Sequence, residues 1–395
     1  MRWAWVALIG LNGCAASSAS LVAPQPTAPA LRAGADVHVH LAMEDALFAF
    51  QGEVNGPELA RSPDQTLVNQ IRIEHLRRVG IRLIVAALWP WFDLRPGVTS
   101  MDETLRQMEA LKALSKKNPE LAIARSAAEA RELISRGRIA VVPGLEGAEA
   151  IRSVEDVDVL HAAGFRVVGL VHFTDNAIAD ADDDQFGPVL GLLLDGKSGG
   201  LTPLGRDAVR RMIELGMLLD LSHASERTRE DVLSITEPAG VPVLYSHAGS
   251  DWEQVRTLDD AHARRIAASG GLIGIGIYRH DALQPIPAEE HWDGFTPESC
   301  DEVIAHWVHY ARVAGPDAVV LGSDLNSVIH RGRPGGFCPD GLRHAGDLPY
   351  LFAGLIARGV PRAPLDDAAE RVLRVLEQAQ LRARGRPIPS QEIQK

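Results

Sequence analysis

Apolar runs alternate with amphipathic stretches along this chain from residue 34 onward. Eight of the runs are rich in Val, Ile and Leu, as expected for parallel strands that are covered on both faces. They are "GADVHVHL" (34–41), "GIRLIVAALWP" (80–90), "RIAVVPGLEG" (138–147), "FRVVGLVHFTDN" (165–176), "GMLLDLSH" (216–223), "VPVLYSH" (241–247), "GGLIGIGIY" (270–278) and "DAVVLGSDLN" (317–326).

Helical patterns separate these runs. Residues 202–216 and 258–271 show the spacing of amphipathic helices, and the second of these ends in a glycine pair that would stop it. The connection between the second and third runs holds two helical patterns, at 100–116 and 126–136. Strand and helix alternating eight times predicts a (β/α)8 TIM barrel. An open, doubly wound sheet is the alternative, and it is disfavoured because no glycine-rich phosphate loop follows the first strand.

Ionisable residues stand at the ends of six of the predicted strands. In a barrel these ends meet at one mouth, where barrel enzymes keep their catalytic residues. Burying so many ionisable groups together is costly unless a cation or a hydrogen-bond network compensates them. The residues are His38, His40, Glu146, His172, His223, His247 and Asp324.

A pair of metal ions explains this pattern better than a purely structural polar cluster. Residues two apart in a strand share a face, so His38 and His40 can reach one ion. Glu146 can bridge two ions, and His223 and His247 would complete the second site. Imidazole and carboxylate ligands suit Zn²⁺ best, with Mn²⁺, Fe²⁺ or Co²⁺ as alternatives. Two such ions would share a water and turn it into a hydroxide nucleophile.

Composition narrows the class of protein. The chain has 395 residues, of which 46% are hydrophobic and 23% charged, enough for a sizeable core. The formal net charge of −12 argues against a nucleic-acid partner, whose phosphates demand a basic surface. None of the cysteines forms a Cys-x-x-C pair, so a metal site must use histidines and carboxylates.

The first 33 residues are interpreted as a signal peptide followed by a Pro/Ala/Ser-rich tether, with a single catalytic barrel over 34–395. The stretch "LNGC" resembles a bacterial lipoprotein cleavage box, which would leave a lipidated Cys14 as a membrane tether. An ordinary cleaved signal with an incidental cysteine is the alternative. Either way we expect export to a bacterial cell envelope or periplasm. There Cys300 and Cys338 form an even pair that an oxidising compartment can join.

The order of several motifs resembles the renal or membrane dipeptidase family of zinc metallopeptidases. The resemblance implies a two-zinc barrel in which His38, Glu146, His223 and His247 match family ligands. It also implies a catalytic Asp324. His172 would contact the substrate, and Arg256 would bind its terminal carboxylate. The motifs that carry it are "GLEGAEAI", "LVHFTDN", "GLTPLGRDAVRRMIELGMLLDLSHAS", "PVLYSHAGS", "GLIGIGIY" and "LGSDLN".

The chain departs from the family pattern near the site. His40 stands where the family has aspartate, which replaces an anionic ligand with a neutral one and makes the site one charge more positive. Asn326 and Ser327 follow the eighth strand, where the family commonly reads "SDFDG". The C-terminal helix also lacks the family's Gly-Asn. These changes affect the expected substrate more than the expected type of reaction.

The sequence therefore predicts an exported metal-dependent dipeptidase that acts on small dipeptides. Two alternatives remain open. One is a related amidohydrolase acting on another small carboxylate-bearing amide, lactam or ester, and the other is a catalytically silent envelope binding protein on the same barrel. Because related barrels often dimerise, a homodimer is a further expectation.

Overall fold

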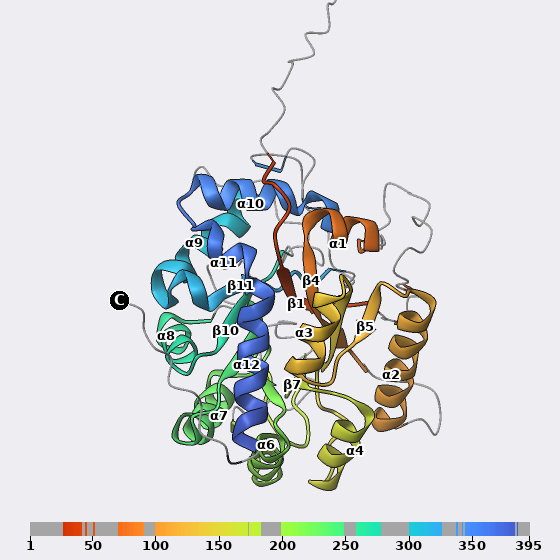
Figure 1. The fold of residues 1–395 in the computed structure, drawn as a ribbon. Helices are drawn as coiled ribbons and strands as arrows, with labels where there is room; N and C mark the ends of the chain where they lie inside the picture. Colours follow the sequence, from red (N-terminus) through yellow and green to blue (C-terminus); the bar gives the residue numbers. More distant parts are fainter. Residues whose placement is uncertain are drawn as a thin grey trace, which may run out of the picture.

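The fold is a barrel of parallel strands surrounded by helices, as predicted (Figure 1). It is seen in a computed structural model. The residues described are 27–41, 44–45, 50–51, 70–90, 99–172, 174–182, 199–248, 258–277, 300–325, 337–338, 342, 344–383 and 385. The predicted signal peptide with Cys14, the substrate-binding Arg256, and Asn326 and Ser327 all lie outside these residues.

Eight strands close the barrel, and each falls on one of the predicted apolar runs. Every strand is parallel to the next one along the chain, and the last pairs with the first through Asp36 and Leu321. The strands are β1 (Gly34–Val39), β4 (Ile81–Leu88), β6 (Ile139–Leu145), β7 (Val167–Gly169), β8 (Leu218–Asp220), β9 (Val243–Ala248), β10 (Leu272–Ile275) and β11 (Val319–Leu321).

Three short strands were not predicted. β5 (Leu121–Ile123) pairs with the first part of β6, on the edge opposite β4, and β7 takes the rest of that edge. β2 (Glu44–Asp45) and β3 (Phe50–Gln51) form a separate antiparallel pair. Two or three residues carry too little hydrophobic periodicity to be read as a strand from the sequence.

The helices predicted at 100–116, 126–136, 202–216 and 258–271 are confirmed, and polar caps start them. Thr99 and Asp102 form a capping box at the first, and the Thr202 side chain accepts a hydrogen bond from Gly205 N–H at the third. The helices are α1 (Ile73–Val79), α2 (Ser100–Lys117), α3 (Ala127–Ser135), α4 (Glu155–Ala163), α6 (Pro203–Leu215), α7 (Glu226–Ala239), α8 (Asp260–Ala268), α9 (Cys300–Ala314), α10 (Leu348–Ala357), α11 (Arg362–Asp366) and α12 (Ala368–Ala383), with 3₁₀ turns η3 (Pro316–Ala318) and η4 (Ala345–Asp347).

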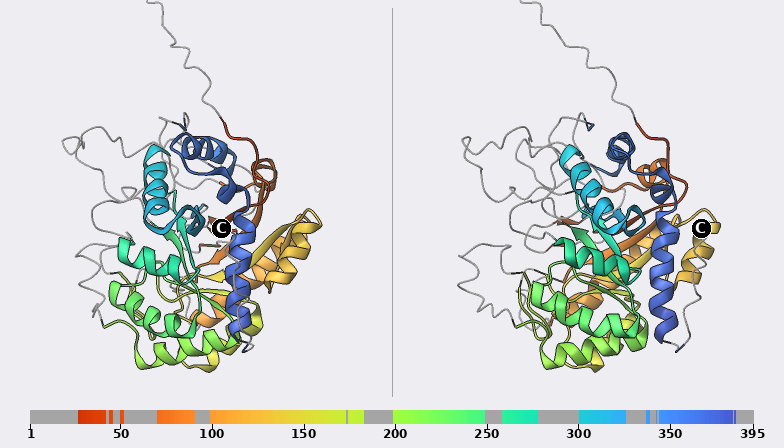
Figure 2. Two further views of the ribbon diagram at one scale, coloured as in Figure 1. Left: turned by 60° about the vertical axis from the view of Figure 1, so that its left-hand side comes forward. Right: turned by 90° about the vertical axis from the view of Figure 1, so that its left-hand side faces the viewer.

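Helix α12 covers the end of the barrel at which the strands begin. Its apolar face, including Val372 and Leu376, belongs to the same buried cluster as the inward-facing strand residues. Ala369 N–H donates to Ala33 O just ahead of β1. The helix crosses in front of the barrel in Figure 1 and stands beside it in the turned views of Figure 2. The opposite end of the barrel, where the strands finish, is left for the site.

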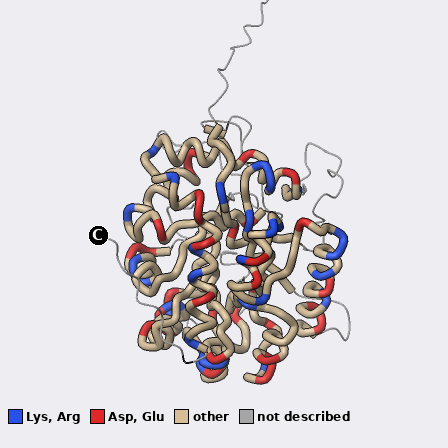
Figure 3. Tube along the Cα trace, viewed as in Figure 1, with Lys and Arg blue, Asp and Glu red and all other residues tan. Residues whose placement is uncertain are grey.

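Charges of both signs are interspersed along the outer helices, as Figure 3 shows from the α12 side. Arg131 of α3, for example, lies 2.9 Å from both Glu370 and Glu377 of α12. Exposed pairs of this kind contribute little individually, so the packing of α12 rests mainly on its apolar face. Within the described residues, no helix combines the length and the apolar composition that crossing a membrane requires.

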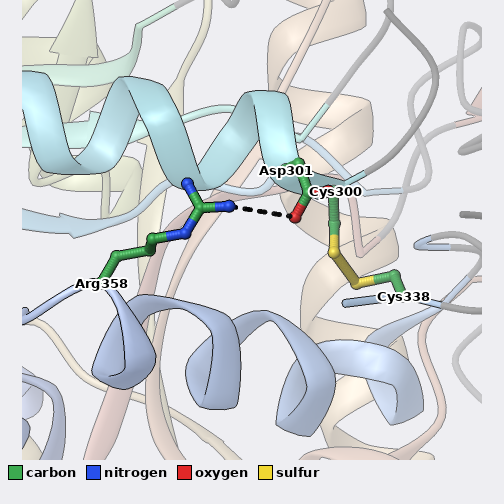
Figure 4. The surroundings of a disulfide bond; sticks show 4 residues. All are labelled: Cys300, Asp301, Cys338 and Arg358. Carbon is green, nitrogen blue, oxygen red and sulfur yellow. Dashed lines mark ion pairs between the residues drawn. A yellow bond between two sulfur atoms is a disulfide. The ribbon is translucent and has the colours of Figure 1, made fainter. Parts of the chain in front are cut away.

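Cys300 and Cys338, whose pairing was possible but undecided from the sequence, form a disulfide. Cys300 is the first residue of α9, and the two Cα atoms lie 5.7 Å apart (Figure 4). Asp301, the next residue, faces Arg358 at the end of α10, with 4.0 Å between their charged atoms. Both contacts tie the start of α9 to the segment that follows β11.

Breaking this disulfide should destabilise the protein without removing the barrel. The bond joins residues 38 positions apart, and closing a loop of that length in the unfolded chain corresponds to about 3–4 kcal/mol. We expect the double variant Cys300→Ala/Cys338→Ala to lose roughly that much free energy of unfolding in a denaturant titration. Reductant should destabilise the wild type equally and leave the variant unchanged. An effect of reductant on the variant would contradict this assignment.

Candidate metal centre

The seven ionisable residues predicted at the strand ends lie together at the carboxyl ends of the strands. Each is buried, with no more than 6% of its surface exposed. His38 and His247 lie within β1 and β9, and the others follow their strands within three residues. Arg256 is the one predicted site residue that the described part of the chain does not include. The seven are His38, His40, Glu146, His172, His223, His247 and Asp324.

The carboxylate of Glu146 contacts all five imidazoles, and its position after β6 places it among them. One oxygen faces four of the rings and the other faces the fifth. The Oε1 to Nε2 distances are 3.1 Å to His223, 3.4 Å to His38, 3.5 Å to His172 and 3.6 Å to His247, and Oε2 lies 3.4 Å from Nε2 of His40.

Contacts among the other side chains complete the cluster. His223 and His247 share a hydrogen bond of 2.7 Å between their Nε2 atoms, and His40 Nε2 lies 3.1 Å from Asp324 Oδ1. Three groups bring ligand atoms close enough to hold an ion. They are His38 with His40 and Asp324, His38 with Glu146 and His247, and Glu146 with His172 and His223. The resemblance divides the ligands differently, placing His38 and His247 on separate ions, but Glu146 is shared in both descriptions.

Two site residues have a strained backbone. His223 and Asp324 have φ angles of 64° and 56°, and they are the only non-glycine residues with positive φ among those the structure describes. This conformation costs about 1–3 kcal/mol at a non-glycine residue and persists where its surroundings hold it. Here Asp182 N–H donates to His223 O at 2.8 Å, and Asp324 N–H donates to His38 O at 2.9 Å. The strain turns both side chains into the cluster.

Two buried carboxylates beneath the cluster hold the strand ends in place, and neither was predicted to have a role. Asp36 Oδ1 accepts hydrogen bonds from the backbone N–H of His38 at 3.3 Å and of Ser323 at 2.9 Å. Asp220 Oδ1 accepts one from the N–H of Ser246 at 2.9 Å. Each carboxylate therefore joins its own strand to another one. The sequence feature that could have revealed them is an aspartate inside an apolar strand, two or three positions before a site residue.

The charges of the cluster compensate one another. Burial opposes a charge on His38, but the neighbouring carboxylates of Glu146 and Asp324 raise its pKa to about 9. Burial would raise the pKa of Glu146, but the charges of His38 and His172 hold it well below its usual value. Burial, together with the charges of His38 and His223, lowers the pKa of His247. A positive charge is therefore stable at His38, between the carboxylates.

These residues fit divalent metal ions. His38 Nε2 and Glu146 Oε2 are buried and have no hydrogen-bond partner, which is rare for such atoms in a folded protein. Both face the other ligand nitrogens and oxygens, so coordination to a cation would satisfy them. Imidazoles and shared carboxylates are the donors that zinc and its neighbours prefer. The cluster has the composition of a binuclear metal site.

Metal uptake should therefore become tighter as the pH rises towards 9. In the metal-free protein His38, with its pKa near 9, carries a proton that a metal must displace. Below pH 9 the affinity should rise by about tenfold per pH unit for this one released proton, and above pH 9 this contribution should disappear. Zinc titrations of metal-free protein between pH 6 and 10, against a chelator of known affinity, measure the slope. A flat profile over pH 6–9 would contradict it.

Comparisons with known proteins bear on the fold and on the family of this chain. Dipeptidase verJ of Clonostachys rogersoniana is 30% identical over 265 residues, covering 66% of this chain and 61% of verJ. The probable dipeptidase PvdM of Pseudomonas aeruginosa has a similar structure, with a TM-score of 0.68 and 20% identity over 88% of this chain and 96% of PvdM. A metallo peptidase from Rhodobacter sphaeroides, liganded with a phosphinate mimic of the dipeptide L-Ala-D-Ala, is also similar in structure. Its TM-score is 0.63 and its sequence identity 21%, and the match covers 90% of this chain and 100% of that one.

The chain spans about three fifths of the length of the curated relatives it matches. The match to the family as a whole is longer, because residues 35–390 fit the family model of membrane dipeptidases, peptidase family M19. Apart from Gly34, the first residue of β1, that range contains every strand of the barrel and every residue of the cluster around Glu146. The chain belongs to the membrane dipeptidase family, peptidase family M19.

Proposed function

We propose that this protein is an exported, metal-dependent dipeptidase that hydrolyses the amide bond of small dipeptides. The observation that carries the proposal is the single carboxylate, Glu146, that contacts five imidazoles at the mouth of the barrel. Membership of the membrane dipeptidase family supports this choice of reaction.

The metal ions would be held by the cluster around Glu146. Zinc is the first choice because imidazole nitrogens dominate the donor set. Bound ions would supply Lewis acidity and would lower the pKa of a bound water towards neutrality. The ligands we assign are His38, His40, Glu146, His223 and His247.

Asp324 is the residue that we assign to proton transfer. Burial raises its pKa, but the hydrogen bond and charge of His40 and the charges of His38 and His247 outweigh burial and lower it below the usual range. The carboxylate is therefore ionised at neutral pH, which is the form that a proton acceptor must have. It would then deliver this proton to the leaving amine, the usual two-step role of one carboxyl group.

His172 is the residue that we assign to the developing oxyanion. Its Nε2 lies 3.5 Å from Glu146 Oε1, and with Glu146 and His223 it forms one of the three groups of candidate ligands. Trp89, the first residue after β4, packs edge-on against its ring with 4.8 Å between the ring centroids. A ring held in this way can donate a hydrogen bond to negative charge on the substrate at no further cost of ordering.

The substrate class follows from the family and from Arg256. A planar, permanently charged guanidinium suits the terminal carboxylate of a dipeptide, which is the role the resemblance gives Arg256. The Rhodobacter sphaeroides protein was crystallised with a mimic of L-Ala-D-Ala. Dipeptides with a D-residue in the second position therefore belong beside L-L dipeptides in the first assays.

The location we propose is the bacterial cell envelope or periplasm. The disulfide between Cys300 and Cys338 supports an oxidising compartment, because such bonds are rare in reducing cytosol. The apolar N-terminal run ending at Cys14 supports export, with lipid on that cysteine as the tether. A homodimer stays a prediction from related barrels.

The reaction is tested by hydrolysis of a panel of L-L and L-D dipeptides by the purified protein. The assays are run with and without a chelator, and metal is counted on the same sample. We expect chelator-sensitive cleavage with about two metal ions per chain. Metal without cleavage of any dipeptide would redirect the search to another amide, lactam or ester. Neither metal nor cleavage would favour a binding protein.

Asp324→Asn is the matched variant for this assay, because it keeps the shape of the side chain and removes its charge. We expect kcat to fall by about 10²–10⁴-fold, the usual contribution of a positioned acid or base, while the metal content stays the same. An unchanged kcat in a metal-loaded variant would remove Asp324 from the mechanism. Loss of metal from the variant would instead show that Asp324 is a metal ligand. Its ligand oxygen lies close enough to the ligand nitrogens of His38 and His40 to hold an ion with them.

Arg256→Ala should distinguish free dipeptides from blocked ones. Losing a charged hydrogen bond of about 1.5–3 kcal/mol should raise KM for free dipeptides roughly 10- to 100-fold. Dipeptides amidated at the C-terminus lack the carboxylate, so their KM should change little. Equal effects on both substrate types, measured by steady-state kinetics, would show that Arg256 does not bind the carboxylate.

A further inference from the structure

The hydroxyl of Ser246 contacts two imidazoles of the metal cluster at once. Ser246 Oγ lies 3.0 Å from Nδ1 of His38 and 2.8 Å from Nδ1 of His247. The two histidines come from β1 and β9, which are not neighbours in the barrel, and Ser246 stands 208 residues after His38 in the chain. Their rings lie against each other, with centroids 3.9 Å apart. One serine side chain, fully buried, therefore supports both rings.

The hydrogen bonds around Ser246 assign a proton to each Nδ1 atom. Ser246 donates its hydroxyl proton to Ser222 Oγ at 3.2 Å. Ser222 Oγ also accepts a hydrogen bond from the backbone N–H of His247 at 3.1 Å. With its one proton used in this way, Ser246 Oγ has only lone pairs left for the imidazoles. Both His38 and His247 must then donate from Nδ1. In its neutral form each ring then has its lone pair at Nε2, where His247 contacts His223 and where both Nε2 atoms face Glu146 Oε1.

The position of this hydroxyl is set by the backbone around it. Ser246 N–H donates to Asp220 Oδ1 at 2.9 Å. Gly274 of β10 and Gly322 after β11 lie so close that a Cβ atom at either would come within 1.8 or 1.7 Å of Ser246 O. Only glycine permits this approach, so β10 and the end of β11 confine the backbone of Ser246. A hydroxyl confined in this way can orient the rings that it touches.

We propose that Ser246 is a positioning residue that orients both His38 and His247 for metal binding by holding each in the tautomer with its proton on Nδ1. The inference rests on the proposed metal centre and deepens it. Either nitrogen of a neutral imidazole can carry the proton, and a ring with its proton on Nε2 cannot offer that atom to a cation. Because a single hydroxyl serves both rings, its loss affects both ligands.

The experiment compares zinc binding by the wild type and by Ser246→Ala. We expect the variant to bind zinc about 10- to 100-fold more weakly, the usual effect of losing a hydrogen-bond partner of a metal ligand. Long-range ¹H–¹⁵N spectra of the imidazoles should show protonated Nδ1 in His38 and His247 of the zinc-loaded wild type. Both signals should shift or disappear in the variant. A role in stability alone would not move these signals.

Two further variants keep the result interpretable. Ser222→Ala removes the acceptor of the Ser246 proton, which then turns towards one imidazole, so we expect weaker zinc binding with one Nδ1 signal lost. Thr104→Val removes a fully buried hydroxyl that donates within its own helix, α2, to Ser100 O at 2.7 Å, and zinc binding should be unchanged.

The outcomes separate this inference from the proposed function. Unchanged zinc affinity in a folded Ser246→Ala variant would overturn the role of Ser246, as would a change confined to one of the two histidines. If Ser246→Ala does not fold, unchanged affinity and spectra in Ser222→Ala would overturn it too. A wild type that binds no zinc would refute the metal centre itself, and with it the reason for holding these tautomers.

Discussion

The buried carboxylate of Glu146, surrounded by five imidazoles, is the interaction on which the rest of the site depends. Each of these groups alone would be unstable at such depth, because burial penalises its charge. Together they compensate, since the pKa of His38 rises to about 9 while that of Glu146 falls. The same arrangement presents several lone pairs to one small volume. The groups that balance one another's charges can therefore also bind metal cations through these lone pairs.

The barrel makes this crowding possible by bringing the ends of separate strands to one mouth. Asp36 and Asp220 fasten pairs of strand ends from below, and glycines let strands approach Ser246 closely. The left-handed backbone of His223 and Asp324 adds strain, which hydrogen bonds from Asp182 N–H to His223 O and from Asp324 N–H to His38 O hold in place. Helix α12 packs on the opposite end of the barrel and stabilises the fold there. The end that carries the site is therefore not needed for this packing.

Much of this fold could be predicted from the chain, because hydrophobic runs and helix caps are local signals. All eight barrel strands lie on runs of Val, Ile and Leu, while the three-residue β5 was missed because it is too short to show a period. The seven clustered residues were also found, since each stands at the end of a run. Asp36, Asp220 and Ser246 received no role, because a polar residue inside a strand does not reveal which strand its hydrogen bonds reach.

The sequence by itself determined the order of the strands, the residues at their ends and the motifs that identify the family. These depend on composition and spacing along the chain. Only the tertiary structure decided that Glu146 stands among five imidazoles and that Ser246 serves His38 and His247 together. It also decided that Cys300 meets Cys338. The physical reason is that closing the barrel sets the distances between residues tens to hundreds of positions apart, and no local pattern contains those distances.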